Sequence, residues 1–427
     1  MNSHIPFAPH EGVKLKSLRD VTRLGHKLCW ITTSYLVATH ILALLGFIAF
    51  ITRPESLSLS LMVGYLIAHV LFAIFSTTAY AHRLVSHRAT AKISNAIHIV
   101  FGYLGQTLAV QGSLVSWAGQ HRVHHAVDGS QRHEEDPYSA IWFESTWLNF
   151  LWSHVLCYFF IHPYLDTKYK KRYQVVLKQH PIMAAQHDHY VFFLIALVFV
   201  MPFCVGWVAS ASVMGGLYMV WISVIASVIT QNITWTVNSF THMWGVDAAK
   251  SSAKNNFFWL LPMGEGNHHA DHHDAPTDYR NGFGLIGWLS DPTRYLLLSL
   301  RALRLVGPLQ RTSRAVEMKV IVERRIKRVQ NQLESVRAEG WTEYEQTLSD
   351  LRGRLFELAK RFDTLKEQKR QLLKTRSEQA RSHFDALISD VQYQLDHAHN
   401  ELRYVYRQLQ VELRAALRTL EPDAINT

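Results

Sequence analysis

Four long apolar segments constrain the fold of this chain more than any other feature of its sequence. They run from about residue 29 to 51, 57 to 80, 190 to 211 and 213 to 237. Each provides roughly 20 mainly apolar residues, the length that an α-helix needs to cross a hydrocarbon layer about 30 Å thick. The sequence therefore predicts an integral membrane protein whose four spanning helices form two hairpins.

The distribution of Lys and Arg predicts how these helices are oriented. Basic residues are abundant in residues 1–27, between the second and third segments, and after the fourth, whereas Arg53 stands alone in the two short turns. Because cytoplasmic loops carry an excess of Lys and Arg, both termini are expected to be cytoplasmic, with residues 1–27 as an N-terminal cytoplasmic segment. Two further apolar stretches, 93–118 and 147–160, include polar residues, which favours interfacial or buried helices.

Net charge and cysteine content narrow the class of protein only partly. A formal net charge of +10 suits nucleic acid, anionic lipid or a phosphate-bearing substrate. Because the basic residues flank the apolar segments, no nucleic-acid partner is expected. The three cysteines lie in apolar stretches, so neither a disulfide framework nor a cysteine metal site is predicted.

The C-terminal region is charged from about residue 315 onwards and has no hydrophobic block. Its apolar residues step by four and three in turn, which is the pattern of a heptad seam. The clearest run is Tyr344, Leu348, Leu351, Leu355, Leu358, Phe362 and Leu365. We expect a membrane domain over residues 28–305 and a C-terminal α-helical coiled-coil domain over residues 306–427. Self-association or docking of a partner is one interpretation of the second, and a solvated helical appendage is the other.

Nine histidines gather where the apolar segments end on one side of the membrane. They are His82, His87, His121, His124, His125, His242, His269, His272 and His273. In an HxxHH pattern, residues i, i+3 and i+4 share one helix face, so each of the two HxxHH groups can aim at one point. Asn238 lies four residues before His242 and would stack with it on a helical continuation of the fourth segment. His82 and His87 lie about 140° apart on a straight α-helix, so they either straddle a helix end or bind two different metals.

Nine imidazoles exceed the three or four protein ligands that one zinc site uses, and two metal ions are the better fit. Imidazole suits zinc, copper, iron and nickel, but open positions for oxygen and a nearby apolar substrate favour iron. A water held by Asn238 could complete one coordination shell. Asp136, Glu265 and Asp271 either fix the imidazole tautomers or are surface charges.

The segments around these histidines resemble the histidine boxes of membrane fatty acid desaturases, most closely the acyl-CoA Δ9, or stearoyl-CoA type, desaturases. The likeness covers roughly residues 25 to 300. It implies an all-α, integral membrane four-helix desaturase fold, a cytoplasmic histidine-rich cap with a bent acyl tunnel, and a di-iron centre held by the nine histidines. The matching segments are HRLVSH at 82–87, HRVHH at 121–125, EEDPY at 134–138, NSFTH at 238–242, GEG at 264–266, HADHH at 269–273 and PTDYR at 276–280.

Three positions depart from the family pattern. One extra residue between GEG and HADHH makes His268 a rival to His269 as a ligand. Gln120 stands where the family often has an acid, and Ala275 replaces a usual phenylalanine. The first departure leaves one ligand open, and the other two concern substrate contacts.

These residues predict a fatty acyl desaturase that introduces a cis double bond, at Δ9, into a saturated long-chain acyl group carried as acyl-CoA or acyl-lipid. An unactivated methylene has no acidic proton, so a metal-bound oxidant made from O2 is required. The chain shows no haem-attachment motif and no dinucleotide fingerprint. Electrons are therefore expected from an external donor, a ferredoxin or small cytochrome with its reductase. With no targeting peptide recognised, a bacterial inner membrane is the favoured location.

Two other functions compete with the desaturase. A membrane di-iron hydroxylase would abstract one hydrogen and return oxygen to the carbon, giving an alcohol. A coiled-coil membrane scaffold would use the histidines for no catalysis at all. The chemical products and the consumption of O2 separate these three.

Trp117, Arg122 and Trp152 are the candidate substrate contacts. Basic residues, including Arg83, Arg88 and Arg122, suit a phosphate-rich head group such as coenzyme A, or else set the topology and contact anionic lipid. The tryptophans either line the acyl tunnel or anchor the protein at the membrane interface.

Overall fold

The structure is a computed structural model that divides into two compact units, residues 1–311 and 312–427. It describes residues 14–128, 130, 135–163, 174–176, 180–248, 251–256, 263, 265–313, 316–324, 327, 341–375 and 381–418. Each unit is treated by itself below.

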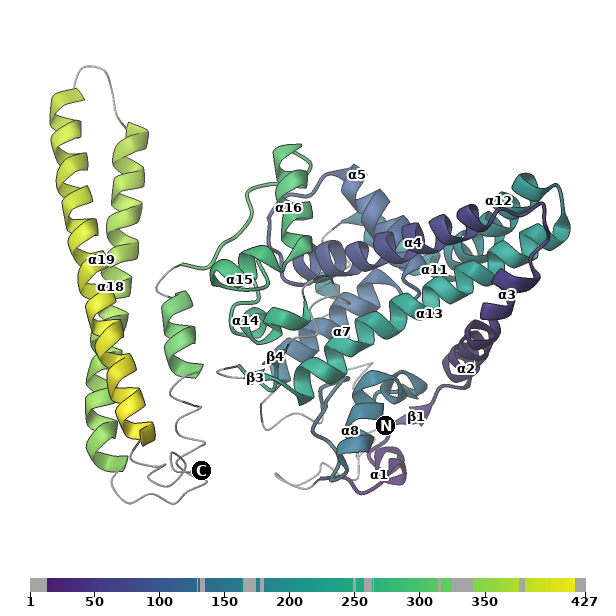
Figure 1. The fold of residues 1–427 in the computed structure, drawn as a ribbon, viewed down its shortest axis with the longest axis horizontal. Coiled ribbons are helices and arrows are strands. Elements are labelled where there is room, and N and C mark those ends of the chain that lie inside the picture. The colour runs from purple at the N-terminus through teal and green to yellow at the C-terminus, as the bar shows by residue number, and fades with distance from the viewer. Residues whose placement is uncertain are drawn as a thin grey trace. The chain divides into compact units, whose positions relative to one another are not determined.

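Helices dominate the described residues, as the sequence predicts (Figure 1). The strands described are two short antiparallel pairs. β1 (Lys27–Leu28) pairs with β2 (Phe160–Ile161), and β3 (Val246–Asp247) pairs with β4 (Lys254–Asn255). The remaining architecture of both units is helical.

Three helices of the described chain are long and apolar enough to cross a membrane: Leu59–Ser86, Tyr190–Ser210 and Val213–Met243. The first joins α4 (Leu59–Phe75) to the π-helix η1 (Ser76–Ser86). The second joins α11 (Tyr190–Leu194), η6 (Ile195–Val200) and α12 (Met201–Ser210), and the third is α13 (Val213–Met243). These three match three of the four predicted segments.

The first predicted segment, residues 29–51, is not one helix. It forms α2 (Trp30–Leu45) and α3 (Phe47–Thr52), which meet at Gly46. The indole of Trp221 donates a hydrogen bond of 2.6 Å to the carbonyl of Leu42, which would otherwise accept from the Gly46 amide. The Gly46 amide turns instead to Ala43, at 2.9 Å. A tertiary contact therefore breaks the helix and leaves α2 shorter than a full span.

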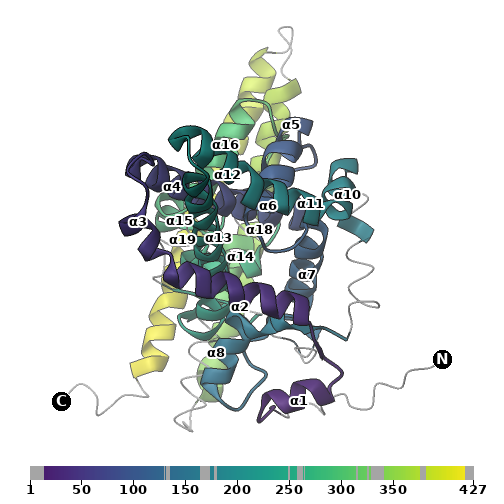
Figure 2. The same cartoon turned by 90° about the vertical axis from the view of Figure 1, so that its right-hand side faces the viewer.

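The hairpin of α12 and α13 depends on close backbone approach. A Cβ atom added at Gly206 would lie 2.3 Å from the carbonyl oxygen of Gly215 on the facing helix. The turn between the helices holds Ala211 in the left-handed region, with φ 51°, and the Ser212 side chain caps α13. Small residues thus let the two apolar helices pack without intervening side chains, as is common in membranes. Figure 2 shows the helices of this unit from the side.

The predicted polar-apolar stretches are broken into short elements. Residues 93–118 form α5 (Asn95–Ile97), η2 (His98–Gly105), α6 (Gln106–Leu108) and the start of α7 (Leu114–Val127). Residues 147–160 form most of α8 (Thr146–His154) and the 3-10 helix η4 (Leu156–Phe159). Their location at a membrane interface stays a prediction.

The remaining short helices surround the ends of the long ones. They are α1 (Leu18–Arg23), α10 (Pro181–Asp188), η7 (Gly266–His268), α14 (His269–Asp274), α15 (Gly284–Leu289) and α16 (Pro292–Ala302). A buried apolar core joins η1, α7 and α16 through residues such as Leu84, Val115 and Leu297. This core fixes the elements that carry most of the histidines.

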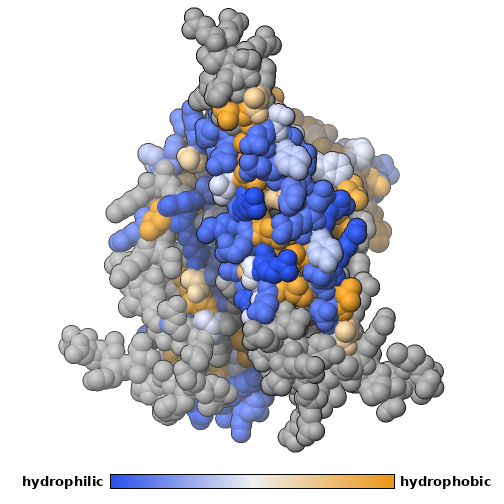
Figure 3. Space-filling view, turned by 90° about the vertical axis from the view of Figure 1, so that its left-hand side faces the viewer, coloured by the Kyte–Doolittle hydropathy of each residue, from blue (hydrophilic) through white to orange (hydrophobic). Residues whose placement is uncertain are grey.

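The second unit is built on two long helices, α18 (Trp341–Thr375) and α19 (Arg381–Arg418), which lie side by side. Phe362 and Leu365 of the predicted seam pack with Val391 and Ala398. Figure 3 shows the side of the molecule that lies at the left in Figure 1. Its coloured atoms are mostly hydrophilic, with separate hydrophobic spots. The packed pair agrees with a helical hairpin, while a true coiled coil and the domain boundaries at 27 and 305 stay predictions.

Candidate metal centre

The π-helical turn of η1 decides how His82 and His87 lie. The backbone amide of His87 donates to the carbonyl of His82 at 3.1 Å, five residues back, and the Ser86 hydroxyl bonds the carbonyl of Ala81 at 2.7 Å. This i→i+5 bonding differs from that of an α-helix and is frequent at functional sites. His87 follows the helix end at Ser86, so the two imidazoles straddle that end and still face one region, with ring centroids 4.9 Å apart.

Two further helices present the HxxHH groups. The hydroxyl of Ser113 accepts from the Ser116 amide and caps α7, which carries His121, His124 and His125. The side-chain oxygen of Asn255 accepts from the amides of Ala270 and Asp271 and so fixes the first turn of α14, which carries the second group. His242 lies near the end of α13, which extends past the predicted residue 237 and carries Asn238 on the same helix, as predicted.

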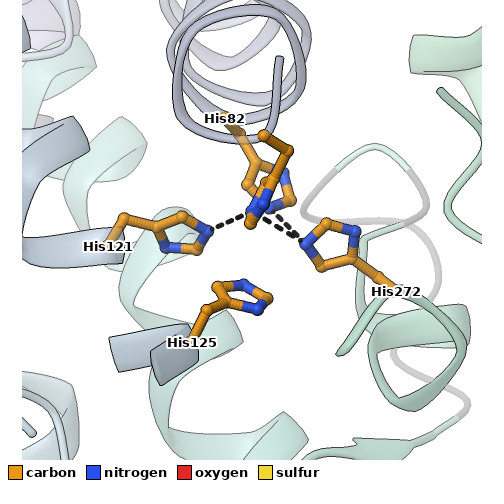
Figure 4. Close-up of side chains that lie close together, drawn as sticks. His82, His121, His125 and His272 are labelled. Carbon is orange, nitrogen blue, oxygen red and sulfur yellow. Dashed lines mark hydrogen bonds between the residues drawn. The ribbon is translucent and has the colours of Figure 1, made fainter. Parts of the chain in front are cut away.

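The nine histidines form two groups in the structure. The five-histidine cluster holds His82, His87, His121, His125 and His272, and the four-histidine cluster holds His124, His242, His269 and His273. Within each cluster the ligand-type nitrogens lie within 4.8 Å of one another. Figure 4 shows four rings of the first cluster pointing from η1, α7 and α14 toward a shared centre. His82 and His87 belong to the same cluster, so the arrangement does not favour their binding different metals.

The spacing of the ring nitrogens fits metal coordination. The Nε2 atoms of His82 and His272 lie 2.8 Å apart, those of His87 and His121 lie 2.8 Å apart, and those of His242 and His269 lie 2.9 Å apart. Metal–nitrogen bonds of about 2.1 Å at right angles separate neighbouring ligand atoms by about 3 Å. The Nε2 atoms of His124, His125 and His273 are buried without a hydrogen-bond partner. Buried polar atoms without partners are costly, and a metal ion in each cluster would satisfy them.

The protonation of these rings also suits a metal. Burial, followed by the neighbouring imidazoles, holds the pKa of His121, His125 and His272 well below its usual range. A neutral imidazole is the form that binds a metal ion. Burial would lower the pKa of His124 as well, but the charge of Asp136 and its hydrogen bond outweigh burial and raise it.

Carboxylates contact the outer nitrogen of several rings. Asp136 lies 3.0 Å from Nδ1 of His124, and Glu265 lies 3.4 Å from Nδ1 of His82. Asp128 lies 3.2 Å from Nδ1 of His273 and 3.7 Å from Nδ1 of His242. Such contacts fix the tautomer so that Nε2 faces the metal. Asp136 and Glu265 were considered for this position from the sequence, whereas Asp128 was missed although it lies one helical turn after His124.

Arg83 is buried in the protein, where it bonds other protein groups, and does not lie at the surface. Its side chain is fully buried and donates to Glu265, at 3.1 and 2.7 Å, and to both carboxylate oxygens of Asp291, at 2.8 Å each. It also donates to the carbonyl of Tyr279 at 2.9 Å. The expectation that Arg83 suits a substrate head group is therefore wrong, because its donors are turned to these partners inside the protein.

The rings of His269 and His268, the two rival ligand candidates, point in different directions in the structure. Nε2 of His269 faces His242 inside the four-histidine cluster. The ring of His268 points elsewhere: its Nε2 lies 2.9 Å from the hydroxyl of Ser290 and its Nδ1 lies 3.3 Å from Asp271. Both nitrogens of His268 thus have polar partners outside the clusters. Asp271 contacts this off-cluster histidine and also accepts a hydrogen bond of 3.1 Å from the side-chain amide of Asn255.

A mostly apolar cavity, here called cavity A, adjoins both clusters. His82, His121 and His269 line it together with Thr77, Trp117, Val237 and Asn238. The indole of Trp117 stacks on His121, with ring centroids 5.0 Å apart. The amide of Asn238 donates to the Tyr158 hydroxyl at 3.1 Å. Trp117 and Asn238 therefore lie at the cavity that adjoins both clusters.

A second cavity, here called cavity B, shares Tyr138 and Tyr158 with cavity A. Trp152 lines cavity B and is almost wholly buried, stacked on Trp142 with centroids 5.1 Å apart. Arg122 lines neither cavity. Its guanidinium donates to the carbonyls of Ser86 and Val85, at 2.9 and 2.7 Å, where it caps η1. Of the three candidate substrate contacts, Trp117 lines cavity A, Trp152 lines cavity B, and Arg122 lines neither of these two.

Comparisons with known proteins agree with this site. The family model described as fatty acid desaturase matches residues 57–284. An acyl-CoA desaturase of Cyprinus carpio is 32% identical over 214 residues, which are 49% of this chain and 62% of the carp protein. This chain thus spans less than two thirds of that relative's length.

Two other relatives are matched over more of their length. Stearoyl-CoA desaturase 5 of Homo sapiens is 30% identical over 239 residues, 54% of this chain and 67% of the human protein. An sn-2 palmitoyl-lipid 9-desaturase of Nostoc sp. (strain 36) is 29% identical over 284 residues, 65% of this chain and 89% of that protein. With the family model covering more than half of its residues, the chain belongs to the fatty acid desaturase family.

Proposed function

We propose that this chain is an O2-dependent fatty acyl desaturase that inserts a cis double bond, at Δ9, into a saturated long-chain acyl group at a di-iron centre. The observation that carries the proposal is the pair of histidine clusters beside cavity A. Relatives named as acyl-CoA and acyl-lipid desaturases support it, and a 9-desaturase among them supports the position of the bond.

The nine clustered histidines would hold the two irons, five imidazoles around one and four around the other. Iron fits an imidazole-rich site that must leave positions open for oxygen. When bound, the irons supply the O2-derived oxidant that removes two hydrogens from neighbouring methylenes, a step beyond the acid-base chemistry of side chains. A water held by Asn238 would complete one coordination shell, because Asn238 lines cavity A near His269.

The chain's own residues position the substrate. Trp117 and Val237 give cavity A an apolar wall, which would hold the methylenes beside the clusters and exclude water. The shared residues Tyr138 and Tyr158 would let an acyl chain extend from cavity B into cavity A. Trp152 would contact the part of the substrate nearer to cavity B. This path would correspond to the bent tunnel of the histidine-rich cap that the family resemblance implies.

The membrane arrangement forms part of the proposal. Three helices of spanning length, with α2 as a shorter fourth, support a multi-pass protein. Both termini would be cytoplasmic, and the sequence favours a bacterial inner membrane. A ferredoxin or small cytochrome with its reductase would supply electrons.

The C-terminal α18–α19 hairpin is proposed to mediate self-association. Deleting residues 312–427 tests this, with light scattering in detergent as the measurement. A truncated protein of unchanged oligomeric state and unchanged activity with its redox partner would leave the hairpin as a solvated appendage.

The function is tested by gas chromatography with mass spectrometry of fatty acids from a desaturase-deficient host that expresses the chain. Derivatisation with dimethyl disulfide locates any new double bond, and parallel assays with stearoyl-CoA and with phospholipid distinguish the acyl carrier. We expect a new Δ9 mono-unsaturated acid. Hydroxy acids would indicate the hydroxylase instead. With iron-loaded protein and reductant supplied, an absence of O2 consumption and of product would favour the scaffold.

A further inference from the structure

The proposed reaction cannot run on O2 and substrate alone. Converting –CH2–CH2– to –CH=CH– releases two protons and two electrons, whereas reducing O2 to two waters takes four protons and four electrons. Two electrons and two protons must therefore come from outside, and the electrons must reach the histidine clusters. The inference below rests on the proposed function and concerns where they enter.

One surface depression reaches the five-histidine cluster directly. It has a volume of about 400 Å³ and is lined by Ser86, His87 and Arg88 at the end of η1 and by Arg122, His125 and Ala126 of α7. His87 and His125 belong to the cluster, and His125 is only half-buried. A molecule seated in the depression would touch two of the proposed ligands.

The depression is separate from the proposed acyl path. Among the described residues, none that lines it also lines cavity A or cavity B. On α7, Trp117 and His121 are four residues apart and share the face toward cavity A. Arg122 and Ala126 are also four apart and share a different face. The clusters are thus approached from two directions, one by a mostly apolar cavity and the other by a basic, open surface.

The two arginines give this surface its charge. Arg122 is held in place by its hydrogen bonds to the carbonyls of Val85 and Ser86. Arg88 is exposed and has φ 52°, a left-handed conformation that glycine usually provides at a helix end. Arginine at such a position carries a conformational cost. Both arginines therefore bring positive charge to the depression.

We propose that this depression is the docking site of an acidic one-electron carrier protein, which passes electrons to the metal centre through the His87 and His125 edge. Complementary charge raises the rate of encounter more than the affinity, and electron-transfer complexes bury small surfaces. A shallow basic depression that ends on two ligand side chains fits such a transient partner. Electron transfer slows steeply with distance, so contact with the ligands themselves favours this place of entry.

Arg88→Gly tests the charge without disturbing the fold, because glycine accepts the left-handed conformation at that residue. Arg88→Lys keeps the charge. Arg304→Gly is a matched control, since Arg304 is also exposed and has φ 60° just after α16 but does not line the depression. The probe is a reduced acidic [2Fe–2S] ferredoxin, mixed with iron-loaded full-length protein in nanodiscs and followed by stopped-flow absorbance.

We expect Arg88→Gly to slow oxidation of the ferredoxin by about five-fold at low salt, with the difference vanishing at high salt. Arg88→Lys and Arg304→Gly should each stay within about two-fold of the unmodified protein. Binding of the ferredoxin to metal-free protein, measured by biolayer interferometry, should weaken in the same order. This second measurement depends on docking and not on turnover.

Equal effects of Arg88→Gly and Arg304→Gly, or no effect of either, would overturn the proposal. If free coenzyme A displaced the ferredoxin from the unmodified protein but not from Arg88→Gly, the proposal would also be overturned. The depression would then be assigned to a substrate head group. Turnover of stearoyl-CoA driven by dithionite is measured alongside. If dithionite gives no double bond with the unmodified protein, the proposed function fails while the binding result still decides the docking site.

Discussion

Among the buried histidines of the described chain, those of the two clusters and His26 at cavity B are buried in different ways. In the two clusters, Nε2 atoms face one another at 2.8–2.9 Å and carboxylates contact the Nδ1 atoms of several rings. At cavity B, His26 is buried among the rings of Trp142, Trp152 and His162, with centroids 5.2, 6.0 and 4.5 Å away. Both ring nitrogens of His26 also have no hydrogen-bond partner.

The comparison shows which observation marks a metal site. A buried ring nitrogen without a partner occurs in both regions, so it does not identify a metal ligand by itself. Convergence of several such nitrogens on one point, with an acid behind the ring, occurs only in the clusters among the described residues. His26 shares its surroundings with indole faces instead, which favours a packing position at the wall of cavity B.

The largest expected effect follows from removing a clustered imidazole. His272→Ala and His124→Ala each delete one ligand from a different cluster and should lower the desaturation rate by at least about 100-fold. Bound iron should fall from about two ions per chain toward one, measured by inductively coupled plasma mass spectrometry. Either variant retaining full activity and full iron would show that its cluster holds no catalytic metal.

Removing the carboxylate that contacts the Nδ1 atoms of two clustered histidines should have the next largest effect on metal binding. Asp128 contacts His242, His273 and the hydroxyl of Ser252, so Asp128→Asn loses the charge but keeps the shape. Substitutions behind metal ligands typically cost about 10- to 100-fold in metal affinity. We expect iron to leave the four-histidine cluster first during titration with a chelator. Asp247→Asn, at a partly exposed acid paired with Lys254, serves as the control.

The titration of His26 should change the stability of the fold and leave the amount of bound iron unchanged. Burial lowers the pKa of His26 to about 4, although the main chain at Val21 opposes the shift. Because the folded pKa lies below the unfolded value, the folded state resists protonation, and stability is lost as the pH falls from about 6.5 toward 4. The loss is at most about 3 kcal/mol.

His26→Phe keeps an aromatic ring between the indoles and removes the titration. The Tm of metal-free protein in detergent, followed by tryptophan fluorescence, should therefore fall less between pH 7 and pH 4 in His26→Phe than in the unmodified protein. Parallel pH profiles would show that folding does not lower the pKa of His26. Iron content at pH 7 should be the same in both proteins, and a loss of iron would move His26 from packing to ligation.

The sequence predicts which histidines gather better than it predicts the helices that carry them. HxxHH spacing places three rings near one face of an α-helix, but the expectation that each group aims at one point is wrong. His124 joins the four-histidine cluster while His121 and His125 join the five-histidine cluster, and α14 divides its histidines in the same way. The shared cluster of His82 and His87 depends on π-helical bonding in η1, which α-helical periodicity does not reveal. The break at Gly46 depends on Trp221, 175 residues further along the chain, and no local pattern marks it.

The charged residues beside the histidine motifs show the same limit of prediction from sequence. Arg83 and Arg122 both lie beside a histidine in the sequence, and both were candidates for a head group. One is buried with Glu265 and Asp291, and the other caps η1. Asp128 could have been found, because its spacing of four from His124 puts it on the same helix face.

The smallest expected effect separates two adjacent residues. His268 has Ser290 and Asp271 as partners and its ring packs against Gly282, so His268→Gln should keep both irons and lower activity by less than about three-fold. His269→Gln should behave like the other cluster variants, because its ring faces His242. Iron content and desaturation rate are measured on both variants together. If His268→Gln lost an iron and His269→Gln kept both, the extra residue after GEG would have shifted the ligand by one position, and the four-histidine cluster would need a different fourth member.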